Sequence, residues 1–550
     1  MSTVVGTAPE TSSRAAGLGG DPTAGTGALL RFGLRRERLP IAGWVLGIEA
    51  LTLSTVAAFG QLYPDAPARA TFARSLASQP AFAVLTGKIF DSSLGGLTAW
   101  RVTLLGGVLA ALMSIFTVVR RTRADEEAGR TELLVSTAVG RAAPLLAALG
   151  CALIGCAAIA VLVAGTLVAR GEQIGGSVAL GLTIAGSGAL FAGLAAVAAQ
   201  MFDGARPALG IAGAAVGVSF GIRAVADAGG DGSAWLRWLS PLGWAEEVRS
   251  FAADRVWVIG LMLLTAMALV ALALRLLGRR DVGLGLFPTG LGPASGALGS
   301  PFGLSGRLHR PSAIGWTAAL VVFGLVTGSI VDSAKYLFAD NRQVTEILAK
   351  IGGQGVITGA VLNGLVGMCA VLAGIAAVAA AGRMVTEEQS ERGALVLATP
   401  VSRTRWQASH LLYVIVIPVV MLAAAGVGCG IMHGIRSGNF GDGFSDSIAA
   451  MLGQIPACWV IGAIAALVHA IAPRFWSASW VILVVVVLLA QLGPILQLPQ
   501  WADNLSPFLH VGMIATAGIP WAAEGILTAL AAVLLAVGCV GLARRDLVAH

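Results

Sequence analysis

Several long stretches of the chain carry no charged residue. They include Ala142–Ala169, Ile174–Phe202 and Ile351–Gly382, and each exceeds the roughly 20 apolar residues that an α-helix needs to cross a bilayer. Charged residues make up only 12% of the sequence, whereas soluble proteins carry about 25%. Strands of a membrane β-barrel would be about 10 residues long and would alternate apolar with polar residues, a pattern that these stretches lack. The sequence therefore predicts an all-α membrane protein.

Hydropathy predicts twelve transmembrane helices, of which the fifth meets Arg223 early. Their ranges are 40–62, 99–120, 143–168, 176–202, 207–226, 256–277, 313–333, 357–382, 407–432, 447–472, 477–497 and 523–542. Lys and Arg concentrate in cytoplasmic loops. With the N-terminus in the cytoplasm, 23 of the 36 Lys and Arg residues fall on the cytoplasmic side. We therefore expect a multi-pass protein with both termini in the cytoplasm. The excess of Arg over Lys and the abundance of Ala and Gly suggest a GC-rich bacterial genome, and hence a bacterial plasma membrane.

Short motifs recur about half the chain length apart. The pairs are "RLPIAGW" (38–44) with "RPSAIGW" (310–316), "LSPLGW" (239–244) with "LSPFLH" (505–510), and "GRRDV" (278–282) with "ARRDL" (543–547). Each motif keeps its place relative to the predicted spans, so the twelve helices form two fused six-helix repeats related by an axis along the membrane normal. The predicted domains are a disordered tail at 1–28, a first repeat at 29–277, a cytoplasmic linker at 278–311 and a second repeat at 312–550.

A charged segment follows the second span of each repeat, at 126–141 and again at 387–403. Each opens with two glutamates, which favour the first turn of a helix, and Thr386 with Gln389 fits a capping box. We expect a short amphipathic helix at the cytoplasmic face in each case, against the alternative of an ordinary solvated loop helix. The residues that define the two segments are Glu126, Glu127, Arg130, Leu133, Leu134, Thr137 and Arg141 in the first, and Glu387, Glu388, Arg392, Leu395, Thr399 and Arg403 in the second.

The pattern E-x-G-x-x-E-x-L-L-x-[ST]-P-V-x-R after the second span resembles the permeases of type-2 ABC exporters. The first copy has Ala138 where that family often has proline, and the second copy has an extra residue before Arg392. The fused form with "RRD" endings is similar to the polyketide-antibiotic exporter, or tetronasin-resistance, branch. The resemblance implies that both segments are coupling helices that contact two copies of a separate ABC ATPase. It also implies export of hydrophobic compounds, and short re-entrant helices at Ser240–Ala252 and Ser506–Ala523.

The chain has no nucleotide-binding loop of its own. It lacks the sequence G-x-x-x-x-G-K-[ST], and "TGKI" at 86–89 has only the GK pair. We therefore expect a transport subunit that binds no cofactor, with ATP and Mg²⁺ held by the partner ATPase. The positive charges are scattered between spans instead of forming a basic patch, which argues against a nucleic-acid partner. The expected partners are the ATPase, membrane lipids and a hydrophobic small-molecule substrate.

Three residues inside spans are candidates for a substrate path. Glu49 lies about ten residues into the first span, where an acid is costly and a functional candidate by default. It could line a cavity or carry a proton, or it could be a structural acid hydrogen-bonded to a neighbouring helix. Met113 and Phe116 could line an apolar path, against the alternative of ordinary packing. The histidines are scattered and the six cysteines lack metal-ligand spacing, so no metal site is expected.

Two other functions stay open at the level of sequence. A twelve-span proton-coupled antiporter would use Glu49 as its proton carrier, but "RRTRADEEAGR" lacks the glycine-to-Asp-Arg order of such transporters. A membrane scaffold or immunity protein is the third alternative. Proton-coupled antiporters also have two six-span halves and a basic loop between the second and third spans, so it is the motif of the duplicated charged segment that favours the permease of an efflux pump.

Overall fold

The computed structural model describes residues 21–77, 86–135, 139–228, 230–280, 284–287, 299–331, 354–496, 499–512, 514 and 518–545. The chain forms two compact units, Met1–Leu291 and Gly292–His550. Both are helical, and the described residues contain no strand beyond one isolated bridge between Phe202 and Phe287. Thr137 and most of the predicted tail lie outside the described residues.

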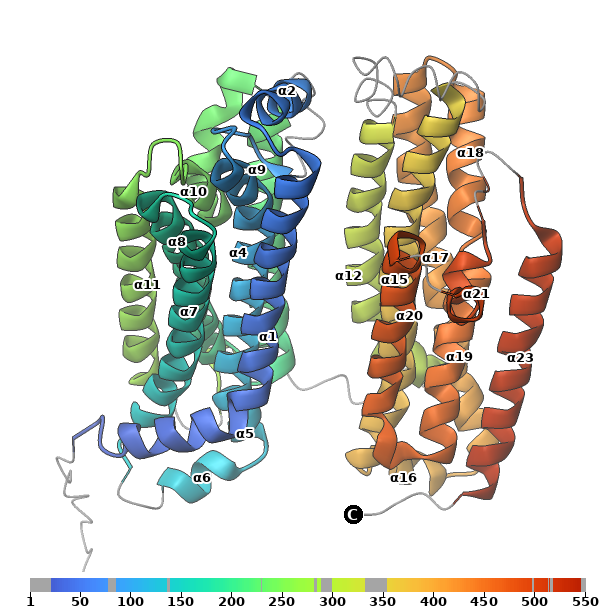
Figure 1. Cartoon of the computed structure of the whole chain (residues 1–550). Helices are drawn as coiled ribbons and strands as arrows, with labels where there is room; N and C mark the ends of the chain where they lie inside the picture. The colour runs from blue at the N-terminus through green and yellow to red at the C-terminus, as the bar shows by residue number, and fades with distance from the viewer. Residues whose placement is uncertain are drawn as a thin grey trace, which may run out of the picture. The chain divides into compact units, whose positions relative to one another are not determined.

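Unit 1 contains six long helices (Figure 1). They are α1 (Thr26–Leu62), α4 (Leu94–Arg121), α7 (Ala143–Ala169), α8 (Ile174–Met201), α9 (Ala205–Ala228) and α11 (Val256–Leu277). The short elements are α2 (Ala66–Ala77), α5 (Arg123–Glu127), α6 (Arg130–Val135), the 3₁₀-helix η1 (Gly230–Leu239) and α10 (Pro241–Glu247). The described part of unit 1 therefore contains six helices of the length expected of membrane crossings.

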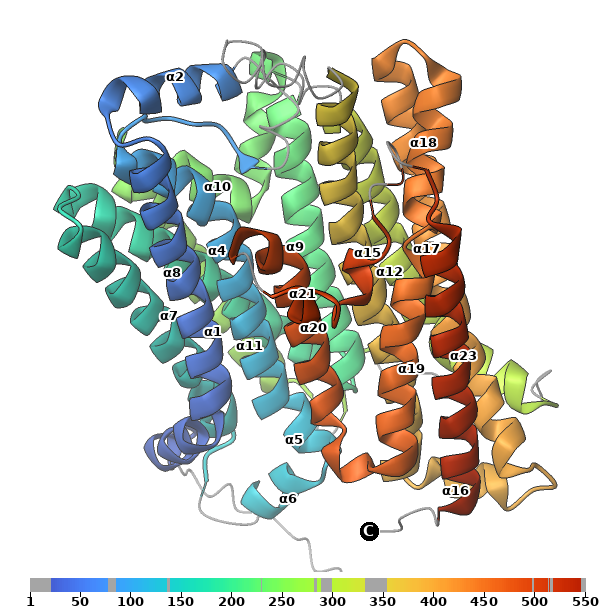
Figure 2. The same cartoon turned by 45° about the vertical axis from the view of Figure 1, so that its right-hand side comes forward.

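Unit 2 has the same order of long helices, except that its fourth crossing is made of two pieces (Figure 2). They are α12 (Pro301–Val331), α15 (Gln354–Gln389), α17 (Arg403–Ser437), α18 (Phe440–Leu452) with α19 (Ile455–Ile471), α20 (Ser477–Leu496) and α23 (Trp521–Arg544). The short elements are α16 (Arg392–Leu397), η2 (Pro473–Phe475), α21 (Gln500–Asp503) and η3 (Pro507–Leu509).

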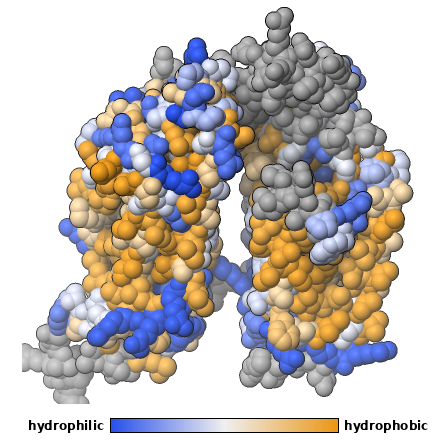
Figure 3. Space-filling view, viewed as in Figure 1, coloured by the Kyte–Doolittle hydropathy of each residue, from blue (hydrophilic) through white to orange (hydrophobic). Residues whose placement is uncertain are grey.

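Every predicted span falls on one of these crossings, and the tenth covers parts of both α18 and α19. Residues 332, 333 and 497 of the predicted spans lie outside the described residues. Within the described residues, eleven helices are long and apolar enough to cross a membrane, and the apolar part of α20 is the shorter segment Ser477–Ala490. Apolar side chains form a broad belt across the middle of each unit on the face seen in Figure 3, with hydrophilic residues at the lower end of both. The prediction of an all-α membrane protein with about twelve transmembrane helices is confirmed.

Two helices begin about ten residues or more before the spans that were predicted within them. The first and seventh spans were placed at or just after Pro40 and Pro311, yet α1 begins at Thr26 and α12 at Pro301, and both prolines lie inside helices. Proline is best tolerated in the first helical turn, yet neither helix begins at Pro40 or Pro311. Instead, the helix runs past each proline, and α12 takes up the last part of the predicted linker.

Small residues let the helices of each unit pack closely. In unit 1, a side chain at Gly181 or Gly188 of α8 would collide with α7. In unit 2, Gly324 and Gly328 of α12 lie directly against the backbone of α17. Gly and Ala at these positions allow close backbone approach, which is the main source of helix association in a membrane.

Candidate functional site

The first charged segment, here called the first elbow (residues 126–141), lies at the end of unit 1 where α4 stops. It is not one helix as predicted but two short ones, α5 and α6, because the backbone turns between them. Gly129 has φ +69°, a left-handed value that glycine adopts without strain. A second break at Thr122, with φ −117° and ψ −85°, separates α5 from α4.

Glu126 is held by two buried arginines. Arg280 donates to its Oε1 at 2.7 Å and to its Oε2 at 3.2 Å, and Arg123 donates to Oε2 at 2.6 Å. The Arg123 side chain is fully buried and that of Arg280 is 3% exposed. Arg280 follows α11 and also donates through Nε to the Gln200 side chain at 2.7 Å, near the end of α8. Glu126 therefore ties the elbow to the ends of two long helices.

Three other polar residues of the first elbow are also anchored. Glu127 accepts a hydrogen bond at 2.8 Å from the backbone N–H of Ala205, the first residue of α9, where a carboxylate favours the helix N-terminus. Arg130 pairs with Asp125 at 2.9 Å and is half-exposed. Arg141 donates to the backbone carbonyl of Arg280.

The second elbow (residues 387–403) begins differently from the prediction. Helix α15 continues without a break to Gln389, so Glu387 and Glu388 occupy its last turn instead of the first turn of a new helix. The predicted capping box is wrong, because Thr386 lies inside α15 and donates to the Gly382 carbonyl at 3.1 Å. Helix α16 starts only after Glu391, whose φ is +58°.

Glu388 lies at the centre of the second elbow. Its Oε2 accepts from Arg545 at 2.8 Å and lies 3.4 Å from Nε2 of His469. Arg545 follows α23 and His469 is near the end of α19. Glu388 therefore connects the elbow to the ends of the last and the fourth crossing of unit 2, as Glu126 does in unit 1.

The ion pairs of the two elbows repeat at a constant offset of 262 residues. Asp125 lies 3.6 Å from Arg121 and 2.9 Å from Arg130. Glu387 lies 3.7 Å from Arg383 and 3.9 Å from Arg392. Each acid is thus placed between an arginine at the end of its long helix and an arginine of the short helix that follows.

The same offset relates Glu126 to Glu388, which corrects the alignment made from sequence. Each pairs with the second arginine of a closing "RRD" motif, Arg280 or Arg545. No residue is inserted before Arg392, and Glu388 corresponds to Glu126 and not to Glu127. Arg403 even repeats the contact of Arg141, donating at 2.9 Å to the backbone carbonyl of Arg545.

Each elbow also exposes one leucine at the equivalent position. The exposed fraction is 73% for Leu133 and 73% for Leu395. The side chain of Leu134 and all of Thr137 lie outside the described residues. Thr399 is exposed and its hydroxyl donates to the Val396 carbonyl of its own turn at 2.6 Å. The elbows thus combine a buried charged base with an apolar tip.

Sequence analysis did not assign Arg280 and Arg545 to this site. Their signal was present in the matched "RRD" endings, but nothing in the sequence shows that the end of the sixth helix lies beside the loop after the second. Gln200 accepts a hydrogen bond from Arg280, and His469 lies next to Glu388. Nothing in the sequence indicated that either residue belongs to the site.

The three candidates for a substrate path have different surroundings. Glu49 is 8% exposed and accepts a hydrogen bond from Thr166 of α7, while its Oε2 is buried without a hydrogen-bond partner in the described part of the chain. Met113 is fully buried in the core between α4 and α7, and Phe116 is 39% exposed and stacks on Trp44. Glu49 thus has the hydrogen bond to a neighbouring helix that is expected of a structural acid, and Met113 packs as a core residue.

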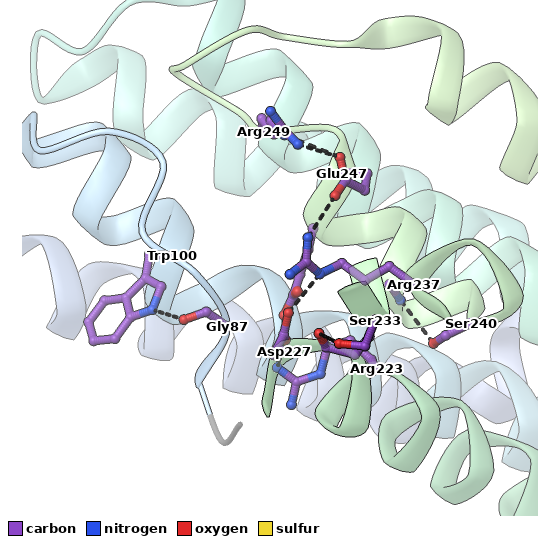
Figure 4. Close-up of polar contacts among 12 residues, drawn as sticks. Gly87, Trp100, Arg223, Asp227, Ser233, Arg237, Ser240, Glu247 and Arg249 are labelled. Atoms are coloured by element: carbon purple, nitrogen blue, oxygen red, sulfur yellow. Dashed lines mark hydrogen bonds and ion pairs between the residues drawn. The ribbon is translucent and has the colours of Figure 1, made fainter. Parts of the chain in front are cut away.

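A second polar group lies where α9, η1 and α10 meet (Figure 4), at the opposite end of unit 1 from α5 and α6 (Figure 1). Arg223 donates to Asp227 at 3.1 Å and to Glu246 at 2.9 Å, and Arg237 donates to Asp227 at 2.7 Å and to Glu247 at 3.3 Å. We call these five residues the buried charge cluster, because none of their side chains is more than 7% exposed. The cluster explains how α9 accommodates Arg223 close to its end.

The buried charge cluster joins η1 and α10 to α9. Helix α10 coincides with the start of the segment Ser240–Ala252, and Ser240 caps it by accepting from the Gly243 N–H at 3.0 Å. In the second repeat, the residues that follow "LSP" carry no charge before Glu524. Of the segment Ser506–Ala523, the structure describes η3 and the start of α23. The two repeats therefore differ in charge at this end.

Burial raises the pKa of Glu246 to about 8, although Arg223 opposes the shift. The nearby Asp227 carboxylate adds to the rise. Oε2 of Glu246 is buried without a hydrogen-bond partner among the described residues, and Glu246 borders a cavity of about 30 Å³ that is also lined by Lys88 and Arg249. That volume is enough for a water molecule.

No group of three or more His, Cys, Asp or Glu side chains could hold a metal ion in the part of the chain that the structure describes. The described cysteines are all free thiols, five of them buried and Cys539 half-buried. The site is therefore made of ion pairs and apolar surface.

Comparison with known proteins gives two consistent matches. The sequence profile of the family described as "Multidrug efflux system permease Rv1217c, C-terminal domain" matches residues 28–280 and 298–542. The chain is 38% identical to "Multidrug efflux system permease protein Rv1217c" of Mycobacterium tuberculosis over 549 residues, which cover 99% of each protein. The similarity thus includes both units and both elbows.

Proposed function

The chain belongs to the family of multidrug efflux system permeases, and from this premise we propose that it is the membrane subunit of an ATP-driven exporter. ATP and Mg²⁺ would be held by a separate ABC ATPase, present in two copies, as in type-2 ABC exporters of the polyketide-antibiotic branch. The exported compounds would be hydrophobic or amphipathic. The protein would lie in a bacterial plasma membrane as two six-helix repeats, with both termini in the cytoplasm.

The observation that supports this proposal most directly is the duplicated elbow. Leu133 and Leu395 are equally exposed, 262 residues apart, on short helices whose bases are fixed by equivalent ion pairs. An ordinary solvated loop has no reason to keep a large apolar side chain exposed at the same position of both repeats. Two equivalent apolar tips match two equivalent grooves, which two copies of one ATPase would provide.

The ion pairs also provide a route for force. A displacement of α16 reaches α15 through the chain and α23 through Glu388 and Arg545. In unit 1, a displacement of α6 reaches α4 through α5, and α11 through Glu126 and Arg280. Movement of the ATPases would therefore act on the second and sixth helices of each repeat together.

The test is whether the leucine tips bind the ATPase. The full chain would be co-expressed with its ATPase, and Leu133→Ser and Leu395→Ser would be made singly and together. Burying one leucine is worth about 2 kcal/mol, so each substitution should weaken association by roughly 30-fold while the helices stay folded. Leu39→Ser is the matched control, since Leu39 is 75% exposed but lies outside both elbows.

Co-purification and ATPase activity stimulated by the permease would be measured. An unchanged association in the double variant would show that the elbows are not the docking sites. Glu127 and Glu388 are poorer probes for this purpose, because both carboxylates support the fold of their own unit.

A further inference from the structure

Unit 2 contains a large apolar groove that neither elbow uses. It has a volume of about 1080 Å³ and lies between α18, α19 and α23. Its walls include Ile448, Leu452 and Trp459 on one side and Gly525 and Ala529 on the other. The Trp459 indole is fixed by donating to the Ile415 carbonyl at 3.0 Å. The groove thus has a rigid aromatic wall.

Small residues on α23 create the space. Gly525, Ala529 and Ala532 follow one another at helical spacing and are all exposed toward the groove. A Cβ atom at Gly525 would meet nothing within 4 Å. Larger side chains at these positions would fill the groove, so its volume depends directly on the composition of this face of α23.

One carboxylate lines the groove among these apolar residues. Glu524 is 8% exposed, and its Oε1 is buried without a hydrogen-bond partner in the described part of the chain. No Lys, Arg or His is among the residues that line the groove. An isolated charge away from water is unfavourable unless it is paired, and none of the described residues that line the groove supplies a cation to pair with Glu524.

We propose that this groove binds lipophilic cations, with Glu524 as the counter-ion. The apolar body of the ligand would lie against α18 and the small-residue face of α23, and its positive group would lie beside the Glu524 carboxylate. Aromatic rings attract cations at their faces, and Trp459 and Trp521 both line the groove. The inference rests on the proposed function in one respect, since it takes the ligand to be a transported compound.

The experiment measures binding of radiolabelled tetraphenylphosphonium to the purified full chain in dodecyl maltoside, without ATPase or nucleotide. We expect Glu524→Gln to weaken binding by about tenfold or more, since the variant loses the charge but not the shape. Gly525→Phe should abolish binding by filling the groove. Asp65→Asn is the matched control, because it removes one exposed carboxylate of unit 1 but keeps the side-chain oxygen that caps α2.

The neutral competitor triphenylphosphine oxide separates charge from shape. This competitor should bind more weakly than tetraphenylphosphonium, and equally to the wild type and Glu524→Gln. It should not bind to Gly525→Phe. Unchanged affinity for tetraphenylphosphonium in Glu524→Gln would overturn the proposal. So would variants that lose only co-purified phospholipid, because the groove would then be a lipid site. A failure of the ATPase-docking experiment would leave these binding results unaffected.

Discussion

Removing the acid at the centre of each elbow should destabilise the two units to different degrees. The substitutions are Glu126→Gln and Glu388→Gln, which keep the size of the side chain. Glu126 lies between the guanidinium groups of Arg123 and Arg280, which are 0% and 3% exposed. Without the carboxylate, two buried positive charges would repel each other. Glu388 faces Arg545, which is 15% exposed, and one histidine.

The magnitudes follow from this difference in burial. Two unit charges 4 Å apart attract by about 4 kcal/mol at an effective dielectric constant of 20, and removing one partner of a buried pair costs about 3–5 kcal/mol. We expect about 3 kcal/mol for Glu126→Gln. Arg545 already has two buried nitrogens without hydrogen-bond partners in the described residues, and its pair is closer to solvent. Glu388→Gln should therefore cost only about 1–2 kcal/mol.

The assay is unfolding of the full chain in mixed micelles of dodecyl maltoside and SDS, followed by helical circular dichroism. Double-mutant cycles of Glu126→Gln with Arg280→Gln, and of Glu388→Gln with Arg545→Gln, isolate the pairwise energies. The first coupling should be about 2 kcal/mol and larger than the second. Equal couplings, or a value below about 0.5 kcal/mol for Glu126 and Arg280, would refute the argument that burial makes the first elbow the stronger anchor.

Three further predictions concern other parts of the fold. The pKa of Glu246 is raised to about 8, so the folded protein keeps a proton that the unfolded chain releases. Stability should therefore fall as pH rises from about 5 to 8. The melting temperature of Glu246→Gln should depend less on pH than that of the wild type. Gly328→Ala should lower stability by at least about 1 kcal/mol, since its Cβ would meet α17. Gly315→Ala has open space around it and should be neutral or stabilising in the same SDS titration. Glu49→Gln should leave drug transport in vesicles insensitive to an imposed proton gradient, as in the wild type, and a gradient dependence that the substitution abolishes would favour the antiporter.

The spans were predictable because apolar runs of this length have few alternatives. Their ends were less predictable, since a proline in the first turn and a proline inside a helix look alike in the sequence. Pro40 and Pro311 show the second case. The capping box failed for a related reason: Thr386 and Gln389 have the right spacing, but no residue before them stops α15.

The elbows were visible in the sequence, whereas their anchors were not. The first repeat has three consecutive acids, Asp125 to Glu127, and the second elbow has only two. The local pattern alone therefore does not show which acids correspond. The ion pairs with Arg280 and Arg545 decide it, and they join segments more than 150 residues apart. Glu524 was missed because an acid in the first turn of a helix normally serves the helix N-terminus, and its apolar surroundings come from two other helices.

The continuity of α15 gives the second repeat a different mechanical element from the first. Its 36 residues extend about 54 Å, well beyond the roughly 30 Å of a bilayer's hydrocarbon core, and they end in the turn that holds Glu388. The corresponding segment of unit 1 is interrupted at Thr122, between α4 and α5. A continuous helix transmits rotation along its whole length, whereas a helix that is interrupted by a turn bends there and transmits less of the rotation. Equal displacements of the two leucine tips would therefore rotate the helices of the second repeat further than those of the first.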